Sequence, residues 1–314
     1  MMDWTDRHCR FFHRLLTPHA RLYTEMVTAM ALTHGDRGHL LAHSEEEQPL
    51  ALQLGGADPV ELAAAARHGA AAGYAEINLN VGCPSDRVQS GRVGACLMRE
   101  PALVAECVAA MRDAVSIPVT VKCRIGVDEQ DDYCDLQHFT ERMIGAGVEW
   151  LVVHARKAWL QGLSPKENRE IPPLNYARVY QLKRDFPALG IVINGGITTP
   201  AQVREHLGQV DGVMLGRAAY HDPYVLALVE ADLFGTPAPT REDVLHRLRP
   251  YVEAQLKRGT RLKHITRHIL GLYQGQPGAR AFRRHLSESA HRDDAGYEVI
   301  LAAIDARDGL RHAA

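Results

Sequence analysis

From residue 21 to about residue 220 the chain repeats one unit: a short apolar and β-branched run, a loop with glycine or a polar residue, and a helical stretch. Seven runs have the composition of strands: residues 22–24, 50–54, 76–79, 119–122, 150–154, 191–194 and 212–215. Helical stretches separate them, several opened by proline, which the first turn of a helix tolerates: residues 59–72, 101–115, 136–146, 176–185 and 200–207. Alternating strands and helices predict a parallel sheet, either doubly wound or closed into a barrel.

Polar side chains near the ends of these runs favour a (β/α)8 TIM barrel, whose active site is built at the carboxyl ends of its strands. These side chains are Glu25, directly after the first run, and then Gln53, Asn78, Asn80, Lys122, His154 and Asn194. The last two runs lead into Asn194-Gly195-Gly196 and Gly216-Arg217, where free backbone N–H groups are typical of a phosphate site. A dinucleotide-binding sheet would need Gly-x-Gly-x-x-Gly after its first strand, and the sequence has none.

The barrel is one strand short, and a helical region follows it. Met1 stands just before a first predicted helix at about residues 5–16, whereas a barrel needs a strand there, so we expect strand one to be missing and the cellular protein to be longer. Residues 236–240 read as a linker, and residues 241–311 have apolar positions at helical spacing with no strand pattern. We therefore predict a catalytic barrel at residues 1–235 and a C-terminal all-α domain at residues 241–314.

Composition excludes several classes of protein. No apolar run approaches the length of about eighteen residues that a membrane helix needs, and we expect a protein without a secretory signal. The six cysteines form no Cys-x-x-Cys pair, so reduced thiols in a cytoplasm are the expectation, and the 17 histidines form no metal-binding motif.

Net charge is unevenly distributed along the chain. Residues 1–240 carry 22 Lys and Arg against 29 Asp and Glu, whereas residues 241–314 carry 14 against 9. A basic C-terminal region on an acidic body is expected if that region contacts a polyanion such as nucleic acid. A solvated, charged helical surface would produce the same asymmetry.

Four side chains are candidates for chemistry. Cys83, between Gly82 and Pro84 on the predicted rim, is poorly placed for core packing and suits a catalytic thiol, although a structural thiol is the alternative and Cys96 is a rival. Lys122 needs an anionic ligand or a carboxylate partner if it is buried. His154 either faces a ligand or is a hydrogen-bonded core histidine, and the Gln53 amide either pairs with a heterocycle or caps a loop.

These motifs together resemble the tRNA-dihydrouridine synthases, flavoenzymes with an FMN-binding barrel and a helical C-terminal domain. The resemblance runs essentially end to end. Two segments, Ala155–Trp159 and Ser164–Pro173, are similar to the A subfamily, which acts on D-loop uridines at tRNA positions 20 and 20a. The segments that carry it include Asn78-Leu-Asn-Val-Gly-Cys-Pro84, Val119-Thr-Val-Lys122, Val153-His-Ala-Arg156, Asn194-Gly-Gly196 and Asp211-Gly-Val-Met-Leu-Gly-Arg217.

The resemblance implies a role for each matching residue. Gln53, Lys122 and His154 would contact the ring and ribityl region of FMN, Asn194, Gly195, Gly196, Gly216 and Arg217 would hold its phosphate, and Met1 would touch the flavin. Asn80 would position the target base, and Cys83 would give a proton to C5 of uracil while FMN reduced by NADPH or NADH delivers hydride to C6.

The implied partner is tRNA, with no membrane and no protein partner. Basic side chains expected to contact it are Arg156, Lys157, Lys166 and Arg169 beside the rim, and Arg280, Arg283 and Arg284 in the helical domain, each of which could equally be a solvated surface group. Two other functions compete: an FMN-dependent barrel reductase of a small molecule, similar to dihydroorotate dehydrogenase, and an RNA chaperone without turnover.

Overall fold

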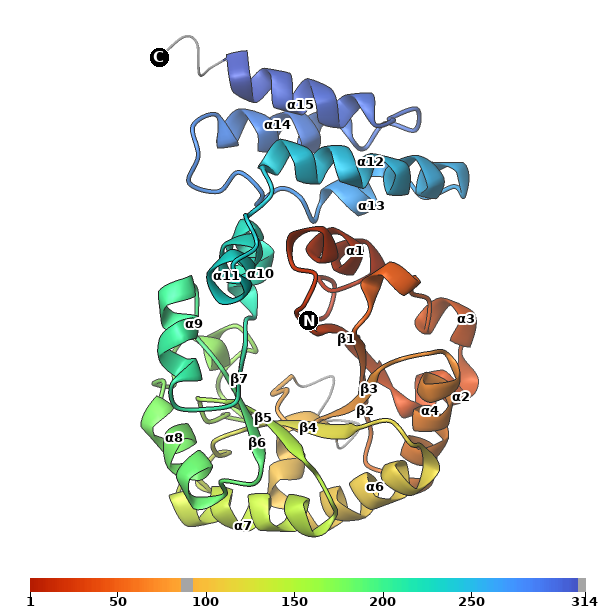
Figure 1. Cartoon of the computed structure of the whole chain (residues 1–314). Helices are drawn as coiled ribbons and strands as arrows, with labels where there is room; N and C mark the ends of the chain where they lie inside the picture. Colours follow the sequence, from red (N-terminus) through yellow and green to blue (C-terminus); the bar gives the residue numbers. More distant parts are fainter. Residues whose placement is uncertain (86–92, 310–314) are drawn as a thin grey trace. The chain divides into compact units, whose positions relative to one another are not determined.

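The seven predicted strands form one parallel sheet in chain order in the computed structural model, which describes residues 1–85 and 93–309 (Figure 1). The strands are β1 (Leu22–Thr28), β2 (Leu50–Gly55), β3 (Glu76–Asn80), β4 (Val119–Arg124), β5 (Trp150–His154), β6 (Gly190–Asn194) and β7 (Gly212–Met214). Each strand pairs with the next in parallel, and helices connect them, so the predicted (β/α)8 barrel class is confirmed. Within the described residues no ladder joins β7 to β1.

The strand ends match the prediction to within two residues except in β1. That strand continues to Thr28, so Glu25 lies inside it, and the expectation that Glu25 follows the strand was wrong. The pairing of β1 with β2 shifts register between Tyr23 and Met26. An irregularity of this kind allows a strand to continue through polar residues such as Glu25. A prediction that follows only the apolar run therefore ends the strand too early.

The five predicted helices are present and lie outside the strands of the barrel unit (Figure 1). Three of them begin with proline, at Pro59, Pro101 and Pro200, as the sequence indicates. The helical elements of this region are α2 (Ala29–His34), α3 (Arg37–Leu40), η1 (Glu45–Glu47), α4 (Pro59–Ala71), η2 (Gly94–Arg99), α6 (Pro101–Ala114), α7 (Tyr133–Gly145), η3 (Glu167–Arg169), α8 (Tyr176–Asp185) and α9 (Pro200–Leu207).

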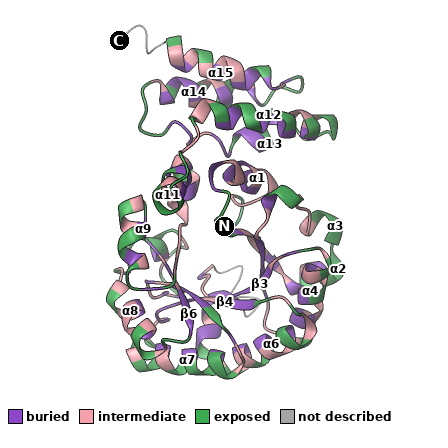
Figure 2. Ribbon diagram, in the orientation of Figure 1, coloured by how far each residue is buried: buried purple, intermediate pink, exposed green. Residues whose placement is uncertain are grey.

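Apolar strand residues make the core of the barrel unit (Figure 2). Leu52, Leu79, Val121, Ile191 and Ile193 are fully buried. Full burial of one such side chain stabilises the fold by about 1.5–3 kcal/mol. Strands of a parallel sheet are usually apolar throughout, but β3 alternates polar and apolar residues, which marks the barrel interior as a polar, functional space.

By their contacts the residues separate into two compact units. The barrel unit contains Met1–Met2, Arg21–Ile197 and Ala201–Gly216, and the helical unit contains Asp3–Ala20, Thr198–Pro200 and the chain from Arg217 onward. The helical unit comprises α1 (Arg7–Leu16), α10 (Arg217–His221), α11 (Tyr224–Phe234), α12 (Arg241–Lys257), α13 (Leu262–Thr266), α14 (Ala279–Ser289) and α15 (Glu298–Gly309).

The helical unit differs in extent from the domain expected at residues 241–314. It also takes in α1, α10 and α11, which precede the linker at residues 236–240. Residues 310 and 311, predicted as helical, lie outside the described residues. None of the described helices is both long enough and apolar enough to cross a membrane.

Asp6 explains why α1 belongs with the C-terminal helices. Its side chain caps α1 by accepting from the backbone N–H groups of His8 and Cys9 at 2.9 and 3.0 Å. The same carboxylate pairs with Arg267 at 2.7 Å and with the buried ring of His268 at 3.0 Å. Burial alone would raise the pKa of Asp6, but the hydrogen bond and charge interaction with His268 hold that pKa well below its usual range.

We predict that Asp6→Asn destabilises the helical unit. The amide still caps α1 but lacks the charge that binds Arg267 and His268, so the free energy of unfolding at pH 7 should fall by about 1.5–3 kcal/mol. In the wild type this stabilisation is complete above the unfolded carboxyl pKa of about 3.9 and is lost as the pH falls further, because the folded pKa is lower.

Urea unfolding between pH 3 and pH 7 measures both effects. Asp36→Asn is the control, since Asp36 caps the short helix α3 in the same way but has no ion pair among the described residues. An unchanged pH dependence in Asp6→Asn would contradict the assignment.

Candidate active site at the carboxyl ends of the strands

Cys83 lies in the loop after β3, and hydrogen bonds to this loop's backbone hold it. The N–H groups of Gly82 and Cys83 donate to Oδ1 of Asn80 at 3.1 and 3.0 Å. The carbonyl of Cys83 accepts from the N–H of Ala95 at 2.8 Å. The Cys83 side chain is half-buried, so its thiol is neither a core group nor a freely mobile surface group.

Gln53 is a strand residue whose amide is bonded to two other amides. It accepts from Nδ2 of Asn80 at 2.9 Å and donates to Oδ1 of Asn78 at 2.8 Å. The loop-capping alternative for Gln53 is therefore wrong. The interstrand registers place Gln53 opposite Asn78, and Asn80 opposite Lys122, so these polar groups share the inner face of neighbouring strands.

Lys122 and Asn194 meet inside the barrel unit. Nζ of Lys122 donates to Oδ1 of Asn194 at 3.2 Å, and Nδ2 of Asn194 donates to the carbonyl of Met214 at 2.7 Å. Across residues 1–85 and 93–309 no carboxylate pairs with Lys122, so the salt-bridge alternative fails there. Burial and then the nearby charge of Arg124 lower the pKa of Lys122 to about 8, which leaves an amine able to bind an anionic or hydrogen-bonding ligand.

The turn after β6 requires its two glycines. Gly195 and Gly196 have φ angles of 121° and 73°. A Cβ atom on Gly195 would lie 2.7 Å from Cδ2 of His154, and one on Gly196 would lie 2.6 Å from Cδ1 of Leu174. The bare backbone can approach a ligand here, as the predicted phosphate site requires.

The remaining predicted cofactor residues are separated by the unit boundary. A Cβ atom on Gly216 would lie 3.8 Å from Nδ2 of Asn194, so Gly216 belongs beside the Asn194 turn. Arg217 begins α10 in the helical unit, while Met1 is counted with the barrel unit and is 36% exposed.

Two of the basic residues expected to bind tRNA are already engaged within the barrel unit. Arg156 donates to the carbonyl of Glu170 at 3.2 Å and to that of Pro172. Nζ of Lys157 lies 3.0 Å from the carboxylate of Asp131 and stacks over Trp159 at 4.1 Å from the ring centroid. These side chains shape the loop after β5.

Four of the other five basic candidates are more accessible. Lys166 and Arg169 are exposed in the segment around η3, and Arg280 and Arg284 are exposed on α14. Arg283 is half-buried and donates to Oε1 of Gln274 at 3.0 Å.

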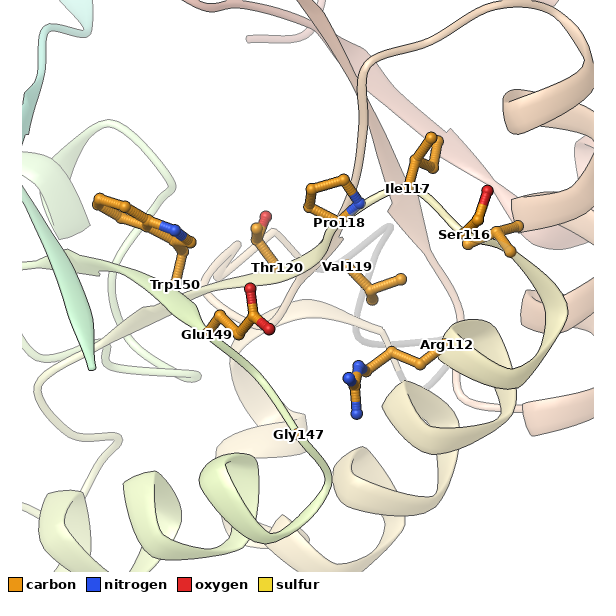
Figure 3. A pocket seen from close by; sticks show the side chains of 10 residues that line it. Arg112, Ser116, Ile117, Pro118, Val119, Thr120, Gly147, Glu149 and Trp150 are labelled. Atoms are coloured by element: carbon orange, nitrogen blue, oxygen red, sulfur yellow. The ribbon is translucent and has the colours of Figure 1, made fainter. Parts of the chain in front are cut away.

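A cavity at the opposite end of β4 and β5 lies apart from these groups (Figure 3). It is lined by Arg112, Val115, Ser116, Ile117, Pro118, Val119, Thr120, Gly147, Glu149 and Trp150, none of which is a predicted site residue. In this fold the amino-terminal face contributes to stability, so the chemistry belongs at the Cys83 end.

Comparison with known proteins decides the family. Dihydrouridine synthase (Dus) is the family whose pattern matches residues 1–307, almost the entire chain. The chain belongs to the dihydrouridine synthase family. The resemblance inferred from its motifs is confirmed.

Several relatives of this chain carry the name tRNA-dihydrouridine(20/20a) synthase. The protein of Xanthomonas campestris pv. campestris is 62% identical over 308 residues, which are 98% of this chain and 92% of the relative. Those of Shewanella oneidensis and Vibrio cholerae are 62% and 59% identical over 305 and 307 residues, covering 96% and 97% of this chain and 91% and 94% of the relatives.

Arg124 is a residue near Cys83 that the sequence analysis missed. It is 3% exposed, and its guanidinium donates to the carbonyls of Gly82 at 2.8 Å, Lys157 at 3.0 Å and Asn168 at 3.1 Å. Burial lowers the pKa of Arg124 to about 10, and the proximity of Cys83 opposes that shift. The signal was present, because alternation along β4 places Lys122 and Arg124 on one face, but the predicted strand ended at residue 122.

We predict that Arg124→Met lowers the free energy of unfolding of the protein by about 3 kcal/mol, because three backbone carbonyls in the loops after β3 and β5 lose their donor. Arg124→Lys should lose less, since an ammonium keeps the charge but reaches fewer of the carbonyls. Urea unfolding is the measurement. Arg112→Met, at an exposed arginine with one carbonyl contact at 3.1 Å, is the control and should change stability by less than about 1 kcal/mol. Equal losses of unfolding free energy in the two methionine variants would contradict the role of Arg124 in joining these loops.

Proposed function

We propose that this protein is a tRNA-dihydrouridine synthase that reduces D-loop uridines at positions 20 and 20a to 5,6-dihydrouridine, with FMN as cofactor and NADPH or NADH as reductant. Relatives bearing the name tRNA-dihydrouridine(20/20a) synthase, about 60% identical over nearly the whole chain, support the substrate. The observation that carries the chemistry is a half-buried thiol, Cys83, in a loop fixed by Asn80 and Arg124 beside the amine of Lys122.

The donor set of the barrel unit fits a phosphorylated planar cofactor. Lys122 and Gln53 offer hydrogen bonds to ring or ribityl oxygens, and the turn at Gly195 and Gly196 offers backbone N–H groups without side chains. His154 packs against this turn and closes one side of the space. When bound, FMN supplies the hydride that adds to C6 of the uracil ring.

The residues of the chain supply the proton and the geometry. Addition of hydride at C6 leaves negative charge at C5 and O4, and Cys83 gives its proton to C5. Arg124 and Lys122 both interact electrostatically with Cys83, so positive charge lies near the group that gives up the proton. Asn80 fixes the backbone of Cys83 and positions the target base, which leaves its stack to reach the rim.

The helical unit and the rim hold the tRNA through phosphate contacts. Arg280 and Arg284 on α14 and Lys166 and Arg169 near η3 are exposed cations suited to this role. Binding through such contacts weakens as salt concentration rises. Because the proposed substrate is tRNA, we expect the enzyme to act in the cytoplasm.

The first test is Cys83→Ala. The variant should bind FMN and accept electrons from NADPH as the wild type does, while dihydrouridine formation on unmodified tRNA falls by about 10²-fold or more, because a general acid is lost. Flavin absorbance, stopped-flow flavin reduction and mass spectrometry of the tRNA measure the three steps. Cys96→Ala is the matched control, and equal turnover by both variants would reject Cys83 as the proton donor. Wild-type activity on free uridine equal to that on tRNA would favour the small-molecule reductase instead.

The second test uses the pKa of Lys122. Because its folded pKa is about 8, the free protein loses this positive charge as the pH rises above 8, and its affinity for FMN should fall several-fold between pH 7.5 and pH 9. Lys122→Met should bind FMN more weakly at pH 7.5 and show little further change up to pH 9. Quenching of flavin fluorescence measures the affinity, and a wild-type affinity that does not change over this range would contradict the assignment.

A further inference from the structure

Strand β3 carries three polar side chains at alternate positions in the barrel interior. Glu76 and Asn78 are 1% and 0% exposed, and Asn80 ends the strand half-buried. The intervening Ile77 and Leu79 are fully buried on the other face of the strand. Polar groups buried in this way are tolerated only when they are hydrogen-bonded.

A single line of hydrogen bonds connects these side chains across three strands. Nδ2 of Asn80 donates to Oε1 of Gln53 at 2.9 Å, and Nε2 of Gln53 donates to Oδ1 of Asn78 at 2.8 Å. Nδ2 of Asn78 then donates to Oγ1 of Thr120 at 2.8 Å, and the Thr120 hydroxyl donates to Oε1 of Glu76 at 2.6 Å. Every donor in the line faces the Glu76 end.

At the Asn80 end, the loop of Cys83 determines which group of each pair donates and which accepts. The backbone N–H groups of Gly82 and Cys83 can only donate, so the oxygen of the Asn80 amide must face them. The NH2 group of Asn80 must then face Gln53. A reversed Asn80 amide would place its own N–H groups against two backbone N–H groups.

At the other end of the line, Glu76 independently imposes the same order of donors and acceptors. Glu76 pairs with Arg21, and its Oε1 accepts from the hydroxyl of Tyr23 at 3.0 Å as well as from Thr120. A carboxylate can only accept hydrogen bonds, so the Thr120 hydroxyl must donate its proton to Glu76. The oxygen of that hydroxyl then accepts from the NH2 group of Asn78. Thr120 also lines the cavity at the amino-terminal end of β4 (Figure 3), so the line runs from that end to the candidate active site.

We propose that Glu76, Asn78 and Thr120 are positioning residues that fix the orientation of the Gln53 and Asn80 amides and, through Asn80, the loop of Cys83. Each amide has two nearly isosteric orientations, and the donors at the Cys83 loop and the acceptor at Glu76 select the same one. The line leaves one N–H of Gln53 Nε2 and one lone pair of its Oε1 in fixed directions for a ligand. The catalytic meaning of this arrangement rests on the proposed function, whereas the mechanical link to Cys83 does not.

Thr120→Val tests the connection between Glu76 and the loop of Cys83. It keeps the shape of the side chain and removes the hydroxyl that bonds to both Asn78 and Glu76. The rate at which iodoacetamide alkylates Cys83 in flavin-free protein, followed by peptide mass spectrometry, reports how firmly the loop is held. We expect this rate to rise about fivefold, as the loss of one buried hydrogen bond would allow. Thr140→Val is the matched control, since Thr140 is fully buried and its hydroxyl donates within its own helix, to the carbonyl of Leu136.

Two further variants separate positioning from general destabilisation. Thr120→Ser restores the hydroxyl and should return the Cys83 rate to that of the wild type. Asn80→Ala should itself raise the rate, and Thr120→Val added to it should have no further effect, although Thr120 and Asn80 are joined only through Asn78 and Gln53. Three outcomes would overturn the proposal. The effects of Asn80→Ala and Thr120→Val on the alkylation rate could multiply in the double variant. Alternatively, Thr120→Ser or Thr140→Val could raise that rate as much as Thr120→Val does.

Affinity for FMN provides a separate readout of the same variants. Thr120→Val should weaken FMN binding about fivefold through Gln53, while Thr140→Val should leave it unchanged. Failure of every variant, wild type included, to bind FMN would contradict the proposed function alone, and the alkylation series would still decide the positioning role. Unchanged FMN affinity in Thr120→Val, in a wild type that binds FMN, would overturn the part of the proposal that concerns Gln53.

Discussion

The interior of the barrel unit depends on satisfying polar side chains where a parallel sheet normally buries apolar ones. The line from Asn80 to Glu76 meets that requirement with directional bonds between 2.6 and 2.9 Å. Because its two ends are groups that can act only as donor and only as acceptor, every member has one orientation. The same bonds that make the burial tolerable therefore also orient the amides nearest to Cys83.

Two cations complete the surroundings of that thiol. Arg124 is bound by carbonyl groups and Lys122 by an amide, with no carboxylate partner for either within residues 1–85 and 93–309. Carbonyl dipoles hold a guanidinium in place without neutralising it, so the positive charge remains available to groups at the rim. Arg124 at the same time joins the loops after β3 and β5, which explains why loop geometry and electrostatics are coupled in this site.

The sequence predicted the seven strands because their apolar runs end in polar or glycine residues, and it placed Cys83, Gln53 and Asn194 at the correct ends of those strands. It missed Arg124 because a charged residue was taken to end β4. Arg156 and Lys157, which it offered as tRNA contacts, have partners in their own unit, and their contact with tRNA stays a prediction. Exposure and pairing of long basic side chains depend on loops folded far away in the sequence, which residue type does not reveal.

The sequence by itself determined the order of the elements, the strand-end chemistry and the family, because these follow from local periodicity and contiguous motifs. Only the tertiary structure decided which polar groups meet: Thr120 with Glu76 across 44 positions of the chain, and Asp6 with His268 across 262. Such contacts depend on register between strands and on packing between helices, where a shift of one residue changes every partner. Local sequence patterns therefore do not predict these contacts.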